Sequence, residues 1–410
     1  MHLSTDPYKG VRDFYPHDQA ILHYLFSTYR RVCEQFGYEE YNASLLEPTA
    51  LYLAKSSQEI VSEQTYSFKD RGEREVTLRP EMTPTLARMV AAQRRELVFP
   101  LRWYSIPNVF RYEKPQRGRL REHWQLNVDL FGGDTTQADA EIITLAYSLL
   151  HAFGAKDSDF EIRVNDRKNM PNDPALLRLL DRKAKMSRED FEREATKLFP
   201  NKKELEMFLN GTYTENQELR TLITTLSTRG ITNVRYTPDV VRGFDYYSGM
   251  VFEVFDTDPK NPRALFGGGR YDNLLDVFGV EKIPAVGFGA GDVTMRDFLE
   301  THNLLPAHLW PHYSPVTKIM LCAVDTLDIT MNSVATLAGM LRERGIPVAV
   351  DFSGKKIGDQ IRNADRRGIP YVIVIGDTEH ASGKFKIKNL ASGEEIEVAS
   401  ADAIATIVAH

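Results

Sequence analysis

Polar side chains alternate along one stretch of this sequence in a way that suits a charged ligand. Every second residue carries such a group: Arg121, His123, Gln125, Asn127 and Asp129. Because successive side chains of a β-strand point to opposite faces, these five would share one face, and the apolar residues between them would face the core. Guanidinium, imidazole, amide and carboxylate groups can together bind phosphate, carboxylate and base edges. The pattern predicts a ligand-binding wall, with a solvated sheet face as the plainer alternative.

A basic loop precedes this strand. Its cations are Lys114, Arg117 and Arg119. Arg111 and Arg119 offer planar pairs of donors that match phosphate oxygens. We expect two strands, at about 101–112 and 121–132, joined by this loop.

Further clusters could also take part in chemistry. Glu81 and Thr83 follow a predicted strand at 75–80, where an acid and a hydroxyl could hold an ammonium group or only begin a helix. Glycines in 242–249 and 267–272 would let the backbone approach a ligand closely, or would only form turns and flexible loops. We expect 267–272 to open a helix.

Composition limits the classes of function. The chain has 410 residues, 42% of them hydrophobic and 26% charged, which is typical of two or three globular domains. The net charge of -6 requires any nucleic-acid contact to use local basic patches. Two distant cysteines form neither a disulfide framework nor a metal cluster, and no apolar run approaches ~20 residues. We expect a cytoplasmic protein without membrane contact or a resident metal.

The element pattern changes along the chain. Up to about residue 300, neighbouring strand patterns predict an antiparallel sheet flanked by helices. The stretch 168–236 looks like a helical insertion without strands, and 301–315 contains three prolines and is typical of a linker. From 316 onward, strands alternate regularly with helices, which predicts a mostly parallel sheet covered on both faces.

Together these segments resemble the histidyl-tRNA synthetase family of class II aminoacyl-tRNA synthetases. The matching pieces are an N-terminal signature at 9–16, class II motif 2 at 110–131, and two histidine-specific signatures at 242–247 and 265–272. The resemblance implies an α+β fold, with a homodimeric class II catalytic domain in 1–310. Residues 316–410 resemble the α/β anticodon-binding domain of the threonyl, prolyl and glycyl enzymes.

This resemblance implies activation of L-histidine by ATP, with Mg2+, to histidyl-adenylate, followed by transfer to tRNA(His). Matched by motif, the residues that bind histidine would be Glu81, Thr83, Gln125, Asp129, Tyr246, Tyr247 and Tyr271. Those that bind ATP would be Arg111, Glu113, Arg119 and His123. Arg242 and Arg111 would be catalytic. The tRNA acceptor end would contact Lys114, Gln116 and Arg117.

The chain departs from the family pattern at several positions. Motif 3 usually has an arginine for the outer phosphates where this chain has Thr294, and Arg296 lies about 200° away around a helix. The usual proline of motif 1 is Ser44. Asp129 stands where the family more often has glutamate. The contacts of the outer phosphates are therefore left open.

A second class of protein also resembles the catalytic part. The regulatory subunit of ATP phosphoribosyltransferase is a non-catalytic paralogue that can sense histidine. It usually lacks the anticodon-binding domain and the signature around Arg242. This chain carries both features, which favours the enzyme.

Overall fold

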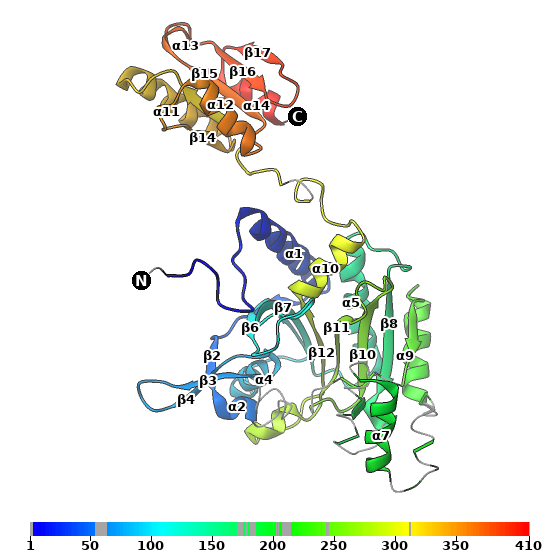
Figure 1. Cartoon of the computed structure of the whole chain (residues 1–410). Coiled ribbons are helices and arrows are strands. Elements are labelled where there is room, and N and C mark those ends of the chain that lie inside the picture. The colour runs from blue at the N-terminus through cyan, green and yellow to red at the C-terminus, as the bar shows by residue number, and fades with distance from the viewer. Residues whose placement is uncertain are drawn as a thin grey trace. The chain divides into compact units, whose positions relative to one another are not determined.

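The computed structural model describes residues 3–53, 64–169, 175–176, 179–180, 186–199, 201, 203, 205–206, 215–238, 240–242, 246–310 and 313–409. The chain divides into two compact units, Met1–Leu305 and Pro306–His410 (Figure 1). No described helix combines the length and the hydrophobicity needed to span a lipid bilayer.

A large sheet forms the centre of the first unit. Its strands, in spatial order, are β1 (Glu39–Glu40), β5 (Leu101–Ser105), β7 (Glu122–Phe131), β12 (Ala285–Gly291), β11 (Ala264–Arg270), β10 (Met250–Asp256), β8 (Phe160–Asp166) and β9 (Val234–Tyr236). Only the outermost pairs, β1 with β5 and β8 with β9, are parallel. The six central strands are antiparallel, as the sequence predicts.

Helices cover one face of this sheet. Helix α5 packs on β7 and β12, and α1 and α9 pack beside α5 (Figure 1). The helices of the unit are α1 (Pro16–Gln35), α2 (Thr49–Leu53), α4 (Thr83–Ala92), α5 (Thr136–Ala152), α7 (Arg188–Leu198), α9 (Gln217–Thr228) and α10 (Asp292–Thr301), with 3-10 turns η1 (Arg167–Asn169) and η3 (Leu274–Phe278). A smaller antiparallel sheet contains β2 (Leu46–Pro48), β4 (Glu75–Leu78) and β3 (Tyr66–Lys69).

Three predicted elements differ from the observed ones. The strand expected at 101–112 is interrupted at Pro107 and gives β5 and the short β6 (Asn108–Phe110), since proline has no amide hydrogen for the ladder. The glycines of 267–272 do not open a helix but lie within β11. The stretch 168–236 contains α7 and α9, yet it ends in strand β9, and many of its other residues lie outside the described residues.

The glycines of β11 and β12 let neighbouring strands and side chains approach very closely. A Cβ atom on Gly268 would lie 2.0 Å from the carbonyl oxygen of Gly287. One on Gly287 would lie 2.5 Å from Oδ1 of Asp129, and one on Gly289 would lie 1.8 Å from Nε2 of Gln125. Backbone atoms therefore exclude a side chain at Gly268 and at Gly287, whereas one at Gly289 would displace the side chain of Gln125.

The second unit is a mixed sheet with helices on both faces. Its strands, in spatial order, are β14 (Val348–Val350), β13 (Ile319–Ala323), β15 (Tyr371–Ile375), β16 (Phe385–Asn389) and β17 (Glu395–Val398). The first three are parallel as predicted, whereas β16 and β17 are antiparallel. The helices are α11 (Asp328–Glu343), α12 (Ile357–Arg366), α13 (Asp377–Ser382) and α14 (Ala401–Ala409). Residues of α11 and α14 share one apolar cluster, and residues of α12 belong to another.

We expect Gly268→Ala to lower the free energy of unfolding by about 1–3 kcal/mol, because the new methyl group would push β11 away from β12. Gly339→Ala is a matched control. Gly339 lies inside α11 with no atom within 4 Å of an added Cβ, so alanine should stabilise that helix by up to about 1 kcal/mol. Denaturant unfolding of both variants measures the effects. Equal stabilities of the Gly268→Ala and wild-type proteins would contradict the packing described here.

Candidate functional site

A polar pocket lies on the face of the large sheet opposite α5. Arg270 of β11 donates to Oδ1 of Asp139 in α5, with its Nε at 3.0 Å. The next residue, Tyr271, points to the other face, where it contacts Asp129. The pocket is lined by Glu81, Thr83, Gln125, Asn127, Asp129, Arg242, Tyr246, Tyr247, Tyr271, Gly287, Phe288 and Gly289.

The structure thus brings together eight residues, from separate parts of the sequence, for which a role in histidine binding or catalysis was predicted. They come from the start of α4, from β7, from the segment before β10 and from the end of β11. The alternation along β7 explains the contribution of that strand. Leu126, Val128 and Leu130 are buried in the core, whereas Gln125, Asn127 and Asp129 face the pocket.

Asp129 is the buried anion of the pocket. Its side chain is 2% exposed, and the hydroxyl of Tyr271 donates a hydrogen bond to Oδ1. Burial raises the pKa of this carboxyl to about 7, and the hydrogen bond from Tyr271 opposes the rise. A small change in its surroundings can therefore change its charge near neutral pH.

Three buried polar atoms of the pocket have no hydrogen-bond partner among the described residues. They are Oδ2 of Asp129, Oδ1 of Asn127 and Nε of Arg242. Buried polar atoms are normally paired, so unpaired atoms that converge on one pocket indicate a ligand. Asn127 belongs to the alternating row in the sequence, but no role was predicted for it. Asn127 lies two residues from both Gln125 and Asp129, so the alternation already indicated that it faces the same pocket.

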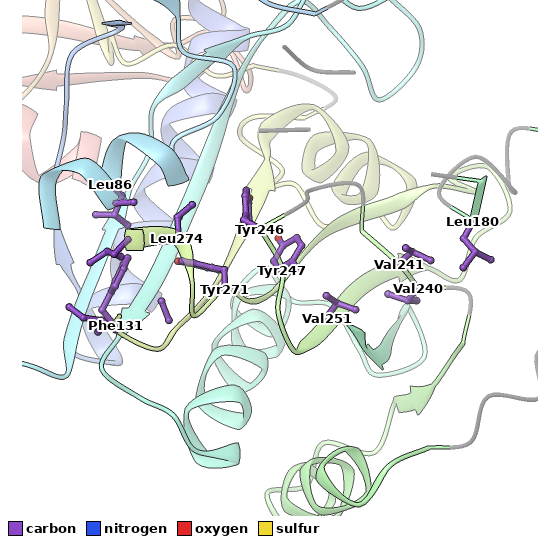
Figure 2. Close-up of a cluster of buried hydrophobic side chains, with 14 of the residues drawn as sticks. Leu86, Phe131, Leu180, Val240, Val241, Tyr246, Tyr247, Val251, Tyr271 and Leu274 are labelled. Atoms are coloured by element: carbon purple, nitrogen blue, oxygen red, sulfur yellow. The ribbon is translucent and has the colours of Figure 1, made fainter. Parts of the chain in front are cut away.

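Tyrosine rings form one wall of the pocket. Figure 2 shows Tyr246, Tyr247 and Tyr271 close together within a larger apolar cluster. The ring centroids of Tyr246 and Tyr247 are 4.8 Å apart, and those of Tyr246 and Tyr271 are 5.7 Å apart. The hydroxyl of Tyr246 donates to Oε2 of Glu81 at 3.2 Å. Burial raises the pKa of each of these tyrosines, so all three stay neutral near pH 7.

Arg242 is held at the edge of the pocket in an uncommon backbone conformation. Its φ angle is 58°, in the left-handed region that residues other than glycine seldom adopt. Its Nη1 lies 3.2 Å from Oε1 of Glu253, and its Nη2 donates to the carbonyl oxygen of Gly267 at 3.2 Å. Residues kept in such conformations cluster at functional sites. Residues 243–245 lie outside the described residues.

The pocket is small in this structure. Its cavity of about 20 Å³ is the size of a water molecule.

The predicted nucleotide-binding residues lie outside this pocket, on β7 and on the loop that precedes it. Nε of Arg111 donates to the carbonyl oxygen of Pro80 at 2.8 Å, which fixes Arg111 beside Glu81. Nη1 of Arg119 lies 3.4 Å from Oε2 of Glu113. Burial and the nearby charges of Arg111 and Arg12 lower the pKa of His123 to about 3, so its ring is neutral.

The loop residues predicted to contact nucleic acid divide into two groups. Lys114 is exposed. Gln116 and Arg117 instead line a second cavity, which also includes Thr294. Arg296 points elsewhere, because its guanidinium binds Asp18 and Glu300.

The ion pair beneath the pocket was missed in the sequence. Asp139 is buried against Arg270, and burial raises the pKa of its carboxyl to about 6 while Arg270 opposes the rise. Arg270 also donates to the carbonyl oxygens of Gly133 and Thr135 in the turn after β7. It therefore ties β11 to this turn.

Comparison with known proteins gives consistent matches along the chain. The family model described as "Histidyl-tRNA synthetase" matches residues 10–166 and 164–292, and the model described as "Anticodon binding domain" matches residues 319–410. The histidine–tRNA ligase of Leptospira biflexa serovar Patoc is 39% identical, over 99% of this chain and 98% of that protein. The histidine–tRNA ligase of Thermoplasma volcanium is 36% identical, over 98% of each chain.

Solved structures share the predicted fold. The histidyl-tRNA synthetase of Nostoc sp. PCC 7120 matches with a TM-score of 0.79 at 23% identity, over 100% of this chain and 99% of that chain. A Bacillus halodurans protein, titled as an ATP phosphoribosyltransferase regulatory subunit/histidyl-tRNA synthetase, matches with a TM-score of 0.71 at 21% identity, over 91% of this chain and 99% of that chain. The predicted α+β fold is confirmed.

Burial of Asp129 makes stability depend on pH. The pKa of the carboxyl is about 7 in the folded protein and about 3.9 in the unfolded chain. Between these values the folded state binds more protons, so this group contributes a loss of stability as pH rises from about 4 to about 7. Asp129→Asn removes that contribution, and we expect the variant to gain free energy of unfolding relative to the wild type between pH 5 and pH 8.

Urea unfolding of both proteins at the two pH values tests this expectation. Asp139→Asn provides a comparison, because burial also raises the pKa of the Asp139 carboxyl, but this carboxyl is paired with Arg270. The same difference between wild type and Asp129→Asn at pH 5 and at pH 8 would contradict the shifted pKa of Asp129.

Proposed function

The chain belongs to the histidyl-tRNA synthetase family, and from that premise we propose that it is a histidine–tRNA ligase. It activates L-histidine with ATP and transfers the histidyl group to tRNA(His). The observation that carries the proposal is the pocket itself. Residues matched to the family's histidine-binding set come from four distant segments and converge on one cavity with unpaired polar atoms.

We assign the amino-acid end of histidine to the start of α4 and to β7. The carboxylate of Glu81 and the hydroxyl of Thr83 accept hydrogen bonds from the α-ammonium group. Gln125 donates to the α-carboxylate. Glu81 is 2% exposed and Thr83 is 6% exposed, so these contacts would form away from water, where charged hydrogen bonds are stronger.

The imidazole of histidine would be recognised by polar side chains of the pocket. One ring N–H donates to the unpaired Oδ2 of Asp129, and the hydroxyl of Tyr247 binds the other nitrogen. Tyr246 and Tyr271 line the pocket, and Tyr271 also fixes the Asp129 carboxylate. A substrate without these nitrogens would leave buried polar groups unpaired at a cost of ~1–3 kcal/mol each. Such readout discriminates without a separate editing step.

We assign ATP to the groups beside the pocket. Arg111 binds the α-phosphate, and Arg119 binds the outer phosphates. Glu113 accepts from the adenine amino group, and His123 stacks on the base. The low pKa of His123 supports this role, because a neutral ring adds no charge under the adenine. The Glu113–Arg119 contact keeps the two groups side by side.

Arg242 would act at the reaction centre. The histidine carboxylate attacks the α-phosphorus, pyrophosphate leaves, and the adenylate forms. The 3′-terminal adenosine of the tRNA then attacks the acyl carbon, and AMP leaves. A fixed guanidinium that spans the carboxylate and the α-phosphate brings two anions together and stabilises the charge that develops. Its contacts with Glu253 and Gly267 hold Arg242 in place before substrate arrives.

Mg2+ belongs to this reaction as a partner of the triphosphate, whose charge it neutralises when bound. Among the described residues, no cluster of three His, Cys, Asp or Glu side chains could hold a metal ion. This fits an ion bound mainly through substrate phosphates and waters, as is usual for Mg2+.

The proposal extends to tRNA and to assembly. We assign residues 1–310 to catalysis and 316–410 to recognition of the anticodon of tRNA(His), with Lys114, Gln116 and Arg117 contacting the acceptor end. The match of 319–410 to the anticodon-binding model supports this division. As in the family, we infer a homodimer in the cytoplasm.

The alternative is a non-catalytic histidine sensor. Its support is the absence of the motif 3 arginine, at Thr294, and the fold shared with the Bacillus halodurans protein. The anticodon-binding match and the presence of Arg242 favour the enzyme.

We expect the purified protein to catalyse exchange between ATP and pyrophosphate with histidine and not with the other amino acids. The reason is that polar groups suited to the nitrogens of an imidazole lie beside two strands whose residues are suited to phosphate. Exchange of labelled pyrophosphate into ATP measures it. Absence of histidine-dependent exchange in folded protein would refute the ligase and favour the sensor.

We expect Arg242→Ala to slow formation of histidyl-adenylate by about 100-fold or more, the scale of losing one preorganised stabiliser of charge. Single-turnover adenylation and the melting temperature are measured together. Arg235→Ala, which removes an exposed arginine of β9, is the control and should retain the rate. If Arg242→Ala changes only the melting temperature, Arg242 has a structural role.

A further inference from the structure

A second cavity, of about 350 Å³, lies next to the pocket and carries an excess of positive charge. Its walls come from the loop residues 116–118, from 260–263 in the hairpin between β10 and β11, from Leu265, and from Thr294 and Asp297 in α10. Three cations, Arg117, Lys260 and Arg263, face one carboxylate, Asp297. The volume is in the range of ligand-binding sites.

Two of these cations are available to an anion. Arg117 lies 3.9 Å from the carboxylate of Asp297, so part of its charge is already balanced. Among the described residues, neither Lys260 nor Arg263 forms an ion pair. Nη2 of Arg263 donates to Oε1 of Gln116 at 3.0 Å, a neutral group that leaves the guanidinium charge uncompensated.

The hairpin that carries these cations is fixed to the body of the unit. The side chain of Asn261 is 8% exposed and donates to Asp256 at 2.7 Å and to Thr301 at 3.1 Å. Nε2 of His302 lies 2.8 Å from the other oxygen of Asp256. Residues at the end of α10 thus anchor Asn261, which fixes the backbone of the hairpin between Lys260 and Arg263.

The cavity lies where the phosphates of a bound nucleotide would extend from the reaction centre. Gly289 lines the first pocket, and Gly291, two strand residues or roughly 7 Å further on, ends β12 and is the N-cap of α10. Gly291 pairs with Gln125 and lies between His123 and Thr294. On the neighbouring strand β11, Leu265 lines the cavity and lies two residues from Gly267. The carbonyl oxygen of Gly267 accepts a hydrogen bond from Arg242.

Thr294 itself contributes no charge to this wall. Its hydroxyl donates to the carbonyl oxygen of Leu265 at 2.6 Å, which ties α10 to β11. A Cβ on Gly118 would lie 3.5 Å from the Thr294 methyl group, so the loop lies directly over this residue. Any cation that joins Arg119 at the outer phosphates in place of the missing arginine must therefore come from another segment.

We propose that Arg263 and Lys260 bind the β- and γ-phosphates of ATP in this cavity and so replace the arginine that is absent at position 294. The inference rests on the proposed function, because it assumes ATP as the substrate. Phosphates of the tRNA backbone share the same chemistry and are the other source of an anion. The position of the cavity favours ATP, since Leu265 in its wall is two strand residues from Gly267, which accepts a hydrogen bond from Arg242.

Calorimetric titration with magnesium pyrophosphate, in the absence of tRNA and amino acid, tests the proposal without requiring catalysis. We expect Arg263→Gln and Lys260→Gln each to weaken pyrophosphate binding by about 10-fold or more, as expected for loss of a charged hydrogen bond. Arg71→Gln, an exposed arginine in the β3–β4 turn, is the matched control and should bind as the wild type does. Melting temperatures verify that all variants fold. If Arg263→Gln does not fold, Lys260→Gln alone provides the test.

Unchanged pyrophosphate affinity in folded Arg263→Gln and Lys260→Gln proteins would overturn the proposal. A rise in the KM for tRNA in the aminoacylation assay, with that affinity unchanged, would assign the cavity to tRNA phosphates instead. Failure of the proposed function is recognised separately, because wild-type protein would then lack histidine-dependent exchange whatever its affinity for pyrophosphate.

Discussion

The site depends on the burial of one carboxylate between closely spaced strands. Asp129 is held within the central strands of the large sheet, with Tyr271 on one oxygen and no protein partner, among the described residues, on the other. Burial raises its pKa to about 7, and a donor that supplies the missing hydrogen bond would favour the charged form. An imidazole N–H is such a donor, which agrees with the histidine contact that we propose.

The same closeness explains why the surrounding strands are rich in glycine. Gly287 cannot carry a side chain because Asp129 occupies that space, and Gly289 leaves room for Gln125. The sheet therefore fixes the polar floor rigidly, as a site that must discriminate between similar ligands requires. The charged groups that we propose for phosphate come instead from loops and turns, such as Arg242 and the hairpin with Arg263.

The division of labour between the two units follows from their architecture. In the first unit, the central antiparallel sheet has helices on one face and the pocket on the other, so a ligand can reach the strands directly. In the second unit, helices from both faces contribute to the apolar clusters around the strands. Its binding surface must then lie at helices or strand ends, as is usual for sheets covered on both faces.

The sequence by itself determined the antiparallel class of the first sheet, the parallel part of the second, the alternation along β7 and most of the residues around the pocket. These features follow from local periodicity and from motif residues, which are visible in the order of the chain. It could not reveal that the glycines of 267–269 pair within a strand, because a glycine run has no side chains to show a period. Nor could it reveal the ion pair of Arg270 with Asp139, or that Arg263 and Thr294 line one cavity. These residues are far apart in the chain, and only the tertiary packing of strands and helices brings them together.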